Sequence, residues 1–172
     1  MSLELIRADL TKLKVDAVVN AANSRLAPGG GVCGAIFAAA GYDQLDRACR
    51  AIGGCETGQA AATDGFQLPA KHIIHTVGPI WHGGGHNEEQ LLRDCYRNSL
   101  DLAKSLGCTS IAFPMISSGI YGYPKEEAIK VAVSAIQAFL EQAEMTVYLT
   151  VFDRQATQLA KTLFPELCGA DL

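Results

Sequence analysis

The chain has 172 residues, of which 49% are hydrophobic and 19% are charged, and its formal net charge is −4. This length favours a single domain, which we take as residues 1–172, and the composition is that of a globular protein. The 14 basic residues are scattered and are outnumbered by 18 acidic ones, so we do not expect a long nucleic acid as partner. A small anion stays open as a ligand, since backbone N–H groups bind anions whatever the net charge.

Predicted strands and helices alternate along the chain. In chain order they are strands at 3–8 and 15–22, a helix at 32–40, a helix capped by Asp43 that stops before Gly53, strands at 59–66 and 72–77, a helix from a capping box of Asn87 and Gln90 through Leu106, a strand at 111–116, a helix from Pro124 through Phe139, a strand at 146–152 and a helix at 155–163. This alternation predicts an α/β fold, a three-layer α/β/α sandwich with a mixed, mainly parallel central sheet.

Targeting signals and metal motifs are not evident. The first residues lack the apolar core of a signal peptide, and no apolar run reaches the about 18 residues of a membrane span, so we expect a cytoplasmic protein that does not bind membranes. His72 and His75 would point to opposite faces of a strand, which does not favour zinc. We expect a monomer, with reduced and mostly buried thiols at Cys33, Cys49, Cys55, Cys95, Cys108 and Cys168.

The first candidate site follows the second predicted strand. Asn20 and Asn23 end this strand, and Gly29-Gly30-Gly31 precede the helix that starts near Val32. Buried asparagine amides need partners, glycines allow a ligand to approach the backbone, and a helix N-terminus offers free N–H groups. The pattern predicts a phosphate site, and a plain strand-to-helix turn is the alternative.

Neither of two common nucleotide-binding motifs is supported by the sequence. Residues 29–34 match G-x-G-x-x-G, but they trail the strand, and the downstream Asp43 and Asp46 fall in a predicted helix instead of ending a second strand. No G-x-x-x-x-G-K-[ST] motif is present. NAD-dependent redox chemistry and a P-loop nucleotidase are therefore disfavoured.

The second candidate site is the segment 117–124, which also joins a buried strand to a helix. It carries hydroxyls and glycines, so the two loops together could hold a diphosphate from both sides. Tyr121 could pack on a sugar or be a surface aromatic. At the strand ends, Phe152 could stack on a base or lie in the core, and Asp9 could accept a hydrogen bond from an amine or cap the helical turn that follows it.

These pieces together resemble the macrodomain family, specifically its MacroD-type branch. The matching segments read ADLTKLKVDAVVNAANSRLAPGGGV, LPAKHIIHTVGP and FPMISSGIYGYP, and the resemblance runs from about residue 5 to residue 165. It implies a mixed sheet between helices and ADP-ribose as the ligand, either free or attached to a protein side chain or an acetyl group. We expect no cofactor and no metal.

The resemblance also implies roles for individual residues. Asp9 would hold the adenine amine, Phe152 would stack near the ring, Asn23 would bond the distal ribose, and Asn20 would support that loop from behind. A water held near the phosphate would attack the anomeric carbon, with Gly119 leaving room and Tyr121 holding the ribose. The remaining ligand contacts would come from Leu10, Gly30, Gly31, Val32, Ser117, Ser118 and Ile120.

One position departs from the family pattern. MacroD-type hydrolases carry an acidic residue ten positions after the second asparagine and a histidine four further on, where this chain has Cys33 and Phe37. Cysteine at this position also resembles some alphavirus macrodomains, which are hydrolases. A thiol at a helix N-terminus is expected to have a lowered pKa, although it bonds more weakly than a carboxylate.

The leading hypothesis is a hydrolase that removes mono-ADP-ribose from acidic side chains or splits O-acetyl-ADP-ribose, with Asn23, Cys33, Gly119 and Tyr121 in catalytic roles. The first alternative is a reader that binds ADP-ribosylated proteins without cleavage, which Cys33 and Phe37 favour. The second is a phosphatase acting on ADP-ribose-1″-phosphate.

Overall fold

A six-stranded sheet forms the centre of the computed structural model, which describes residues 2–170 and 172. Its spatial order is β1-β6-β5-β2-β4-β3, and only the edge strand β3 runs antiparallel to its neighbour. The predicted mixed, mainly parallel sheet is therefore confirmed. The strands are β1 (Ser2–Ile6), β2 (Ala17–Ala22), β3 (Ala60–Asp64), β4 (His72–Val77), β5 (Ser110–Phe113) and β6 (Thr146–Thr150).

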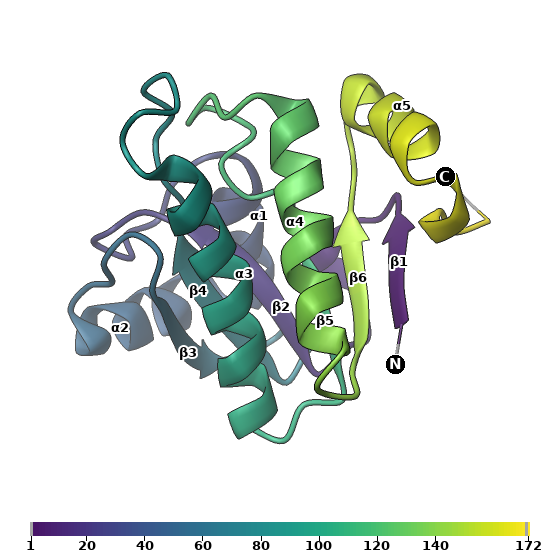
Figure 1. The fold of residues 1–172 in the computed structure, drawn as a ribbon. Helices are drawn as coiled ribbons and strands as arrows, with labels where there is room; N and C mark the ends of the chain where they lie inside the picture. The colour runs from purple at the N-terminus through teal and green to yellow at the C-terminus, as the bar shows by residue number, and fades with distance from the viewer. Residues whose placement is uncertain (1, 171) are drawn as a thin grey trace.

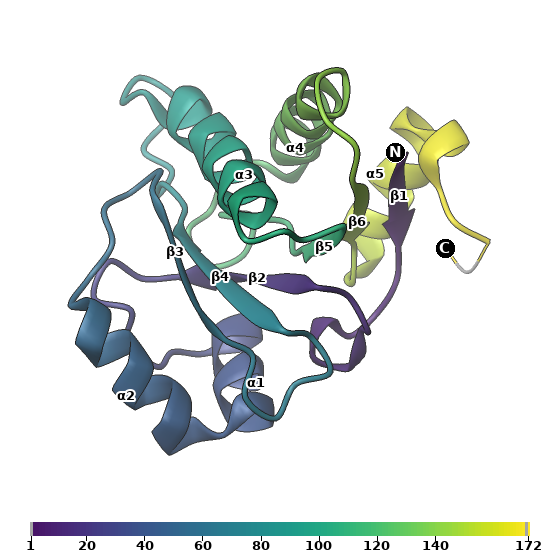
Figure 2. The same cartoon turned by 90° about the horizontal axis from the view of Figure 1, so that it is seen from below.

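Helices cover both faces of this sheet, which confirms the predicted α/β/α layers (Figure 1 and Figure 2). One apolar cluster packs α1 (Gly31–Ala40) and α2 (Tyr42–Ile52) against one face. A larger cluster packs the remaining helices against the other face: α3 (Glu88–Ser105), α4 (Lys125–Leu140) and α5 (Arg154–Leu163). Two short 3-10 turns, η1 (Leu10–Lys12) and η2 (Pro165–Leu167), complete the elements.

Several strands are shorter than the sequence predicted, and the difference lies mainly at their carboxyl ends. β1 stops at Ile6, β6 stops at Thr150, and β5 stops at Phe113 because Pro114 has no N–H to continue the ladder. The residues that follow β5 and β6 are apolar enough to look like strand. They instead form the loops at the carboxyl ends of the strands.

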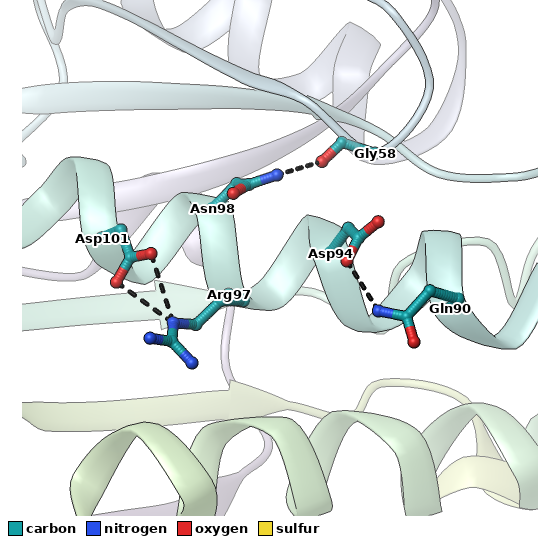
Figure 3. A network of polar contacts seen from close by, with 6 residues as sticks. All are labelled: Gly58, Gln90, Asp94, Arg97, Asn98 and Asp101. Atoms are coloured by element: carbon teal, nitrogen blue, oxygen red, sulfur yellow. Dashed lines mark hydrogen bonds and ion pairs between the residues drawn. The ribbon is translucent and has the colours of Figure 1, made fainter. Parts of the chain in front are cut away.

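Neither predicted cap makes its side-chain bond, although Asn87 does occupy the N-cap position of α3. α2 starts at Tyr42 with Gly41 before it, so Asp43 lies in the first turn and makes no cap bond. Asn87 precedes α3 with a left-handed φ of 65° and no side-chain cap bond. The Gln90 side chain, expected to reach back to Asn87, donates to Asp94 Oδ1 at 2.8 Å instead (Figure 3).

Helix α3 is fixed to the segment that precedes β3. Asn98 Nδ2 donates to the Gly58 carbonyl oxygen at 2.7 Å (Figure 3). The Gly58 N–H in turn donates to Val77 O at the end of β4. The exposed pair of Arg97 and Asp101 lies alongside on the same helix. Helix α3 is thereby held beside the carboxyl end of β4, near the candidate site.

Candidate functional site

The main cavity lies where the chain changes direction across the sheet. From β2 the chain continues through α1 and α2 to β3 and β4 on one side, whereas from β5 it continues through α4 to β6 on the other. The crevice outside the carboxyl ends of such a strand pair is the usual ligand site of an open α/β sheet. A cavity of about 450 Å³ opens there, between the β2–α1 and β5–α4 loops.

The cavity brings together most of the predicted site residues. Its lining includes Asn23, Gly30, Gly31, Val32, Cys33, Ser117, Gly119, Ile120 and Tyr121. Five predicted residues do not line it: Asp9, Leu10, Asn20, Ser118 and Phe152.

In the β2–α1 loop, the backbone of the glycine run is left open to the cavity. Gly30 precedes α1 without any side-chain cap, so the first N–H groups of the helix have no side-chain acceptor. Gly31 has a φ of 56°, which favours glycine. Asn23 closes this loop on itself, because its amide donates to Ala27 O at 2.8 Å and accepts from Ala27 N at 3.0 Å. The loop therefore presents a preformed cluster of N–H donors suited to a phosphate.

Asn20 is buried behind the start of α1 and does not line the cavity. It is 1% exposed, and its Nδ2 lies 3.7 Å from Cys33 Sγ and 3.0 Å from His75 Nδ1. Nδ1 then acts as an acceptor, so the proton of this ring lies on Nε2, 3.0 Å from Thr63 Oγ1. Asn20 Oδ1 has no partner among the described residues.

The contribution of His75 was not predicted. Sequence reasoning treated it only as half of an unlikely zinc pair, yet it pairs with Asn20 in register across β2 and β4 and is fully buried. Burial lowers the pKa of His75 from 6.5 to about 4, so the ring is neutral at pH 7. Sheet pairing is the missing signal, since strand order cannot be read from either strand alone.

The Cys33 thiol has the opposite pKa shift to the one expected from its place on α1. Burial raises the pKa of Cys33 and outweighs the hydrogen bonds from Asn20 and the Gly29 backbone. The thiol, 7% exposed, therefore stays protonated at pH 7 and lies 3.8 Å from Ala27 O. One turn further on, Phe37 is 1% exposed and is a core residue. Cys33 offers no charge to the cavity.

The β5–α4 loop forms the facing wall. Ser117 has a left-handed φ of 66°, is buried, and its Oγ has no hydrogen-bond partner within the described chain. Ser118 Oγ donates to Met115 O at 3.0 Å, so its hydroxyl hydrogen is already engaged within the loop. Ile120 is 96% exposed at the loop tip, and nothing lies within 4 Å of a Cβ placed on Gly119. This loop can thus close on a ligand with backbone groups and an apolar cover.

Asp9 and Phe152 follow neighbouring strands, β1 and β6. Phe152 is 67% exposed, so the core alternative is wrong and its ring is available for stacking. Asp9 caps η1 by accepting from Thr11 N at 2.9 Å and Thr11 Oγ1 at 2.7 Å, and these bonds lower its pKa. Leu10 is buried beneath this turn. Asp9 and Phe152 are both exposed, and they lie beyond the carboxyl ends of their strands, on the same side of the sheet as the cavity.

A second cavity of about 320 Å³ adjoins the first and was missed from the sequence. The two share Asn23, Gly78 and Tyr121 in their linings. Segment 79–87, with two histidines and three glycines, forms much of its wall, but no motif drew attention to it.

The next findings concern metal-ion sites and membrane-spanning helices within residues 2–170 and 172. There, no three His, Cys, Asp or Glu side chains are grouped to hold a metal ion, and no helix is long and apolar enough to cross a membrane. All six cysteines are unpaired thiols.

Comparison with known proteins settles the family. The Macro domain profile matches residues 19–132, which include β2 from Val19 onward, both glycine loops and the start of α4. The chain belongs to the Macro domain family. The macrodomain of Oceanobacillus iheyensis, solved as a point mutant with ADPR, superposes with a TM-score of 0.90 at 40% identity, over 96% of this chain and 92% of that one.

Curated macrodomains are more similar still. This macrodomain is 54% identical to the Macro domain-containing protein mll7730 of Mesorhizobium japonicum, over 88% of this chain and 86% of that protein. It is 47% identical to a protein of Citrobacter rodentium named O-acetyl-ADP-ribose deacetylase, over 95% of this chain and 96% of that protein. The similarity therefore extends over nearly the whole chain, with both loops inside it.

Proposed function

We propose that this macrodomain binds ADP-ribose in the main cavity and hydrolyses its esters, namely O-acetyl-ADP-ribose and mono-ADP-ribosylated acidic side chains. The observation that carries this proposal is the pair of backbone-lined loops that face each other across one cavity at the switch point of the sheet. A diphosphate fits between them because the start of α1 offers N–H groups without side-chain acceptors. Relatives named O-acetyl-ADP-ribose deacetylase support the choice of ester.

In the proposed complex, ADP-ribose lies across the main cavity and extends along the carboxyl ends of the strands. Gly31 and Val32 with residues 118–121 wrap the diphosphate, and Asn23 and Tyr121 hold the distal ribose. The adenine extends toward the ends of β1 and β6, where Asp9 accepts from its amine and Phe152 stacks on its ring. Phe152 is exposed enough to do so.

Hydrolysis then depends on positioning. For a protein ester, a water oxygen bonds to the anomeric carbon, the bond from that carbon to the acceptor oxygen breaks, and the acceptor leaves as a carboxylate while a proton passes to solvent. Cys33 cannot act as the base because burial raises its pKa. The loops therefore contribute by orienting the water and ribose.

A calorimetric titration with ADP-ribose, followed by release assays on both esters, tests the proposal. Binding with release of ADP-ribose establishes a hydrolase. Binding without release over hours makes the protein a reader, which the neutral Cys33 thiol favours as the second candidate. Absence of binding rejects both.

Replacing Cys33 by Asp distinguishes these candidates further. The position lies in the first turn of α1, where negative charge is favoured, and Asn20 Nδ2 can donate to the new carboxylate. We expect turnover to rise by about 10²-fold, in the range typical of an added acid–base group. Cys33→Asn, of the same size without the charge, is the control and should give no gain. An equal rate for both variants contradicts a missing carboxylate.

A further inference from the structure

We infer that the second cavity binds the acceptor side of an ADP-ribosylated protein, that is, the modified acidic residue with its flanking backbone. The inference rests on the proposed function of the main cavity and adds to it the site that holds the acceptor. It predicts a preference for protein esters over the small acetyl ester.

The two cavities are joined at the position assigned to the distal ribose. Asn23 and Tyr121, the residues proposed to hold that sugar, line both cavities, and Gly78 lies between them without a side chain. A group bonded to the ribose therefore has space to extend into the second cavity.

The volume of the second cavity is larger than an acetyl group needs. An acetyl group occupies on the order of two water volumes, about 60 Å³. The cavity holds about 320 Å³, so the acetyl ester would leave most of it to solvent. An acidic side chain with adjoining peptide would fill it.

Its lining matches such a peptide chemically. His82 and His86 lie with ring centroids 5.6 Å apart and offer imidazole N–H donors to the ester carbonyl or to peptide carbonyls. Ile80, which is 51% exposed, and Leu91 add apolar surface for aliphatic parts of neighbouring residues. The one carboxylate in the wall, Glu88, is already engaged by three backbone N–H groups, so it does not leave an unpaired charge facing the ligand.

The wall is also held in place before any ligand arrives. Glu88 Oε2 accepts from His82 N at 2.8 Å and Gly84 N at 2.9 Å, and Oε1 accepts from His86 N at 2.6 Å. Trp81 N donates to Tyr121 O at 2.8 Å, which couples this segment to the β5–α4 loop. A preformed wall reduces the ordering cost of binding a flexible peptide.

The test compares three ligands: free ADP-ribose, O-acetyl-ADP-ribose, and a peptide carrying ADP-ribose on glutamate, with a stable amide-linked analogue for binding. We expect the peptide analogue to bind about tenfold more tightly than free ADP-ribose, as two added hydrogen bonds allow. The double variant His82→Ala/His86→Ala should lose this advantage and cleave the peptide ester about tenfold more slowly, with the Kd for ADP-ribose and the rate on the acetyl ester unchanged.

His72→Ala is the matched control, because His72 lies at the opposite end of β4 and outside both cavities. Equal affinity of the wild type for the peptide analogue and free ADP-ribose overturns the inference, as does an advantage that survives in the double variant. Either result leaves the proposed function standing. Failure of free ADP-ribose to bind at all rejects both.

Discussion

Gly78 follows β4 at the point where the two cavities meet. A Cβ at this position would overlap Ser117 Oγ and lie 2.6 Å from Ile116 Cγ2, two buried side chains of the β5–α4 loop. The bare backbone is thus required by close packing, and Ser117 keeps its left-handed conformation against it.

We expect Gly78→Ala to lower the free energy of unfolding by about 1–3 kcal/mol, the usual cost of overpacking a buried site. Urea denaturation with matched m-values measures this. Gly119→Ala is the control, because its Cβ meets nothing within 4 Å and should leave stability unchanged while weakening ADP-ribose binding. A Gly78→Ala protein as stable as the wild type would show that the loop moves aside at no cost.

Individual residues show where sequence reasoning succeeds and where it stops. Asn23 and the glycine run were placed correctly on the main cavity, because a strand end followed by glycines and a helix is a local pattern. The pKa of Cys33 was predicted with the wrong sign, because the helix terminus was visible in the sequence and the burial was not. Burial depends on which strands and loops lie alongside.

At the scale of elements, Glu88 organises the segment 79–87 ahead of α3. Burial by itself would raise the pKa of Glu88, but hydrogen bonds from the backbone of His82, Gly84 and His86 outweigh it and lower the pKa to about 2. The carboxylate is therefore charged at neutral pH, and the wall of the second cavity depends on it.

Glu88→Gln should loosen this segment specifically, since an amide in place of a carboxylate turns one acceptor into a donor facing an N–H group. We expect faster hydrogen exchange at the amides of residues 82, 84 and 86, with helix α3 beyond its first turn unchanged. Glu89→Gln, which removes only an exposed partner of Arg93, serves as control. Unchanged protection in Glu88→Gln would argue against this anchoring role.

At the scale of the whole molecule, His75 connects three strands. From β4 its ring reaches Asn20 on β2 and Thr63 on β3, and both neighbours are buried with it. The folded pKa is about 4 against 6.5 for the ordinary side chain, so the unfolded chain takes up the proton first on acidification. This contribution to stability is complete above the unfolded pKa and is lost as the pH falls toward the folded one.

We expect the free energy of unfolding to fall by about 2 kcal/mol between about pH 7 and pH 5 from His75 alone. His75→Gln should be less stable at pH 7 and should show a smaller decline over this range, as measured by urea denaturation at each pH. His72→Gln should retain the decline of the wild type. A wild-type protein whose stability is flat between these pH values would contradict the assignment.

The sequence by itself determined the alternation of strands and helices, the two glycine loops and the family resemblance, since each depends on residues close together in the chain. Only the tertiary structure decided the strand order, the switch point between β2 and β5, the pairing of Asn20 with His75 and the second cavity. The physical reason is the same in each case. Local patterns set periodicity and turns, whereas burial, pKa values and cavities arise from contacts between segments far apart in sequence.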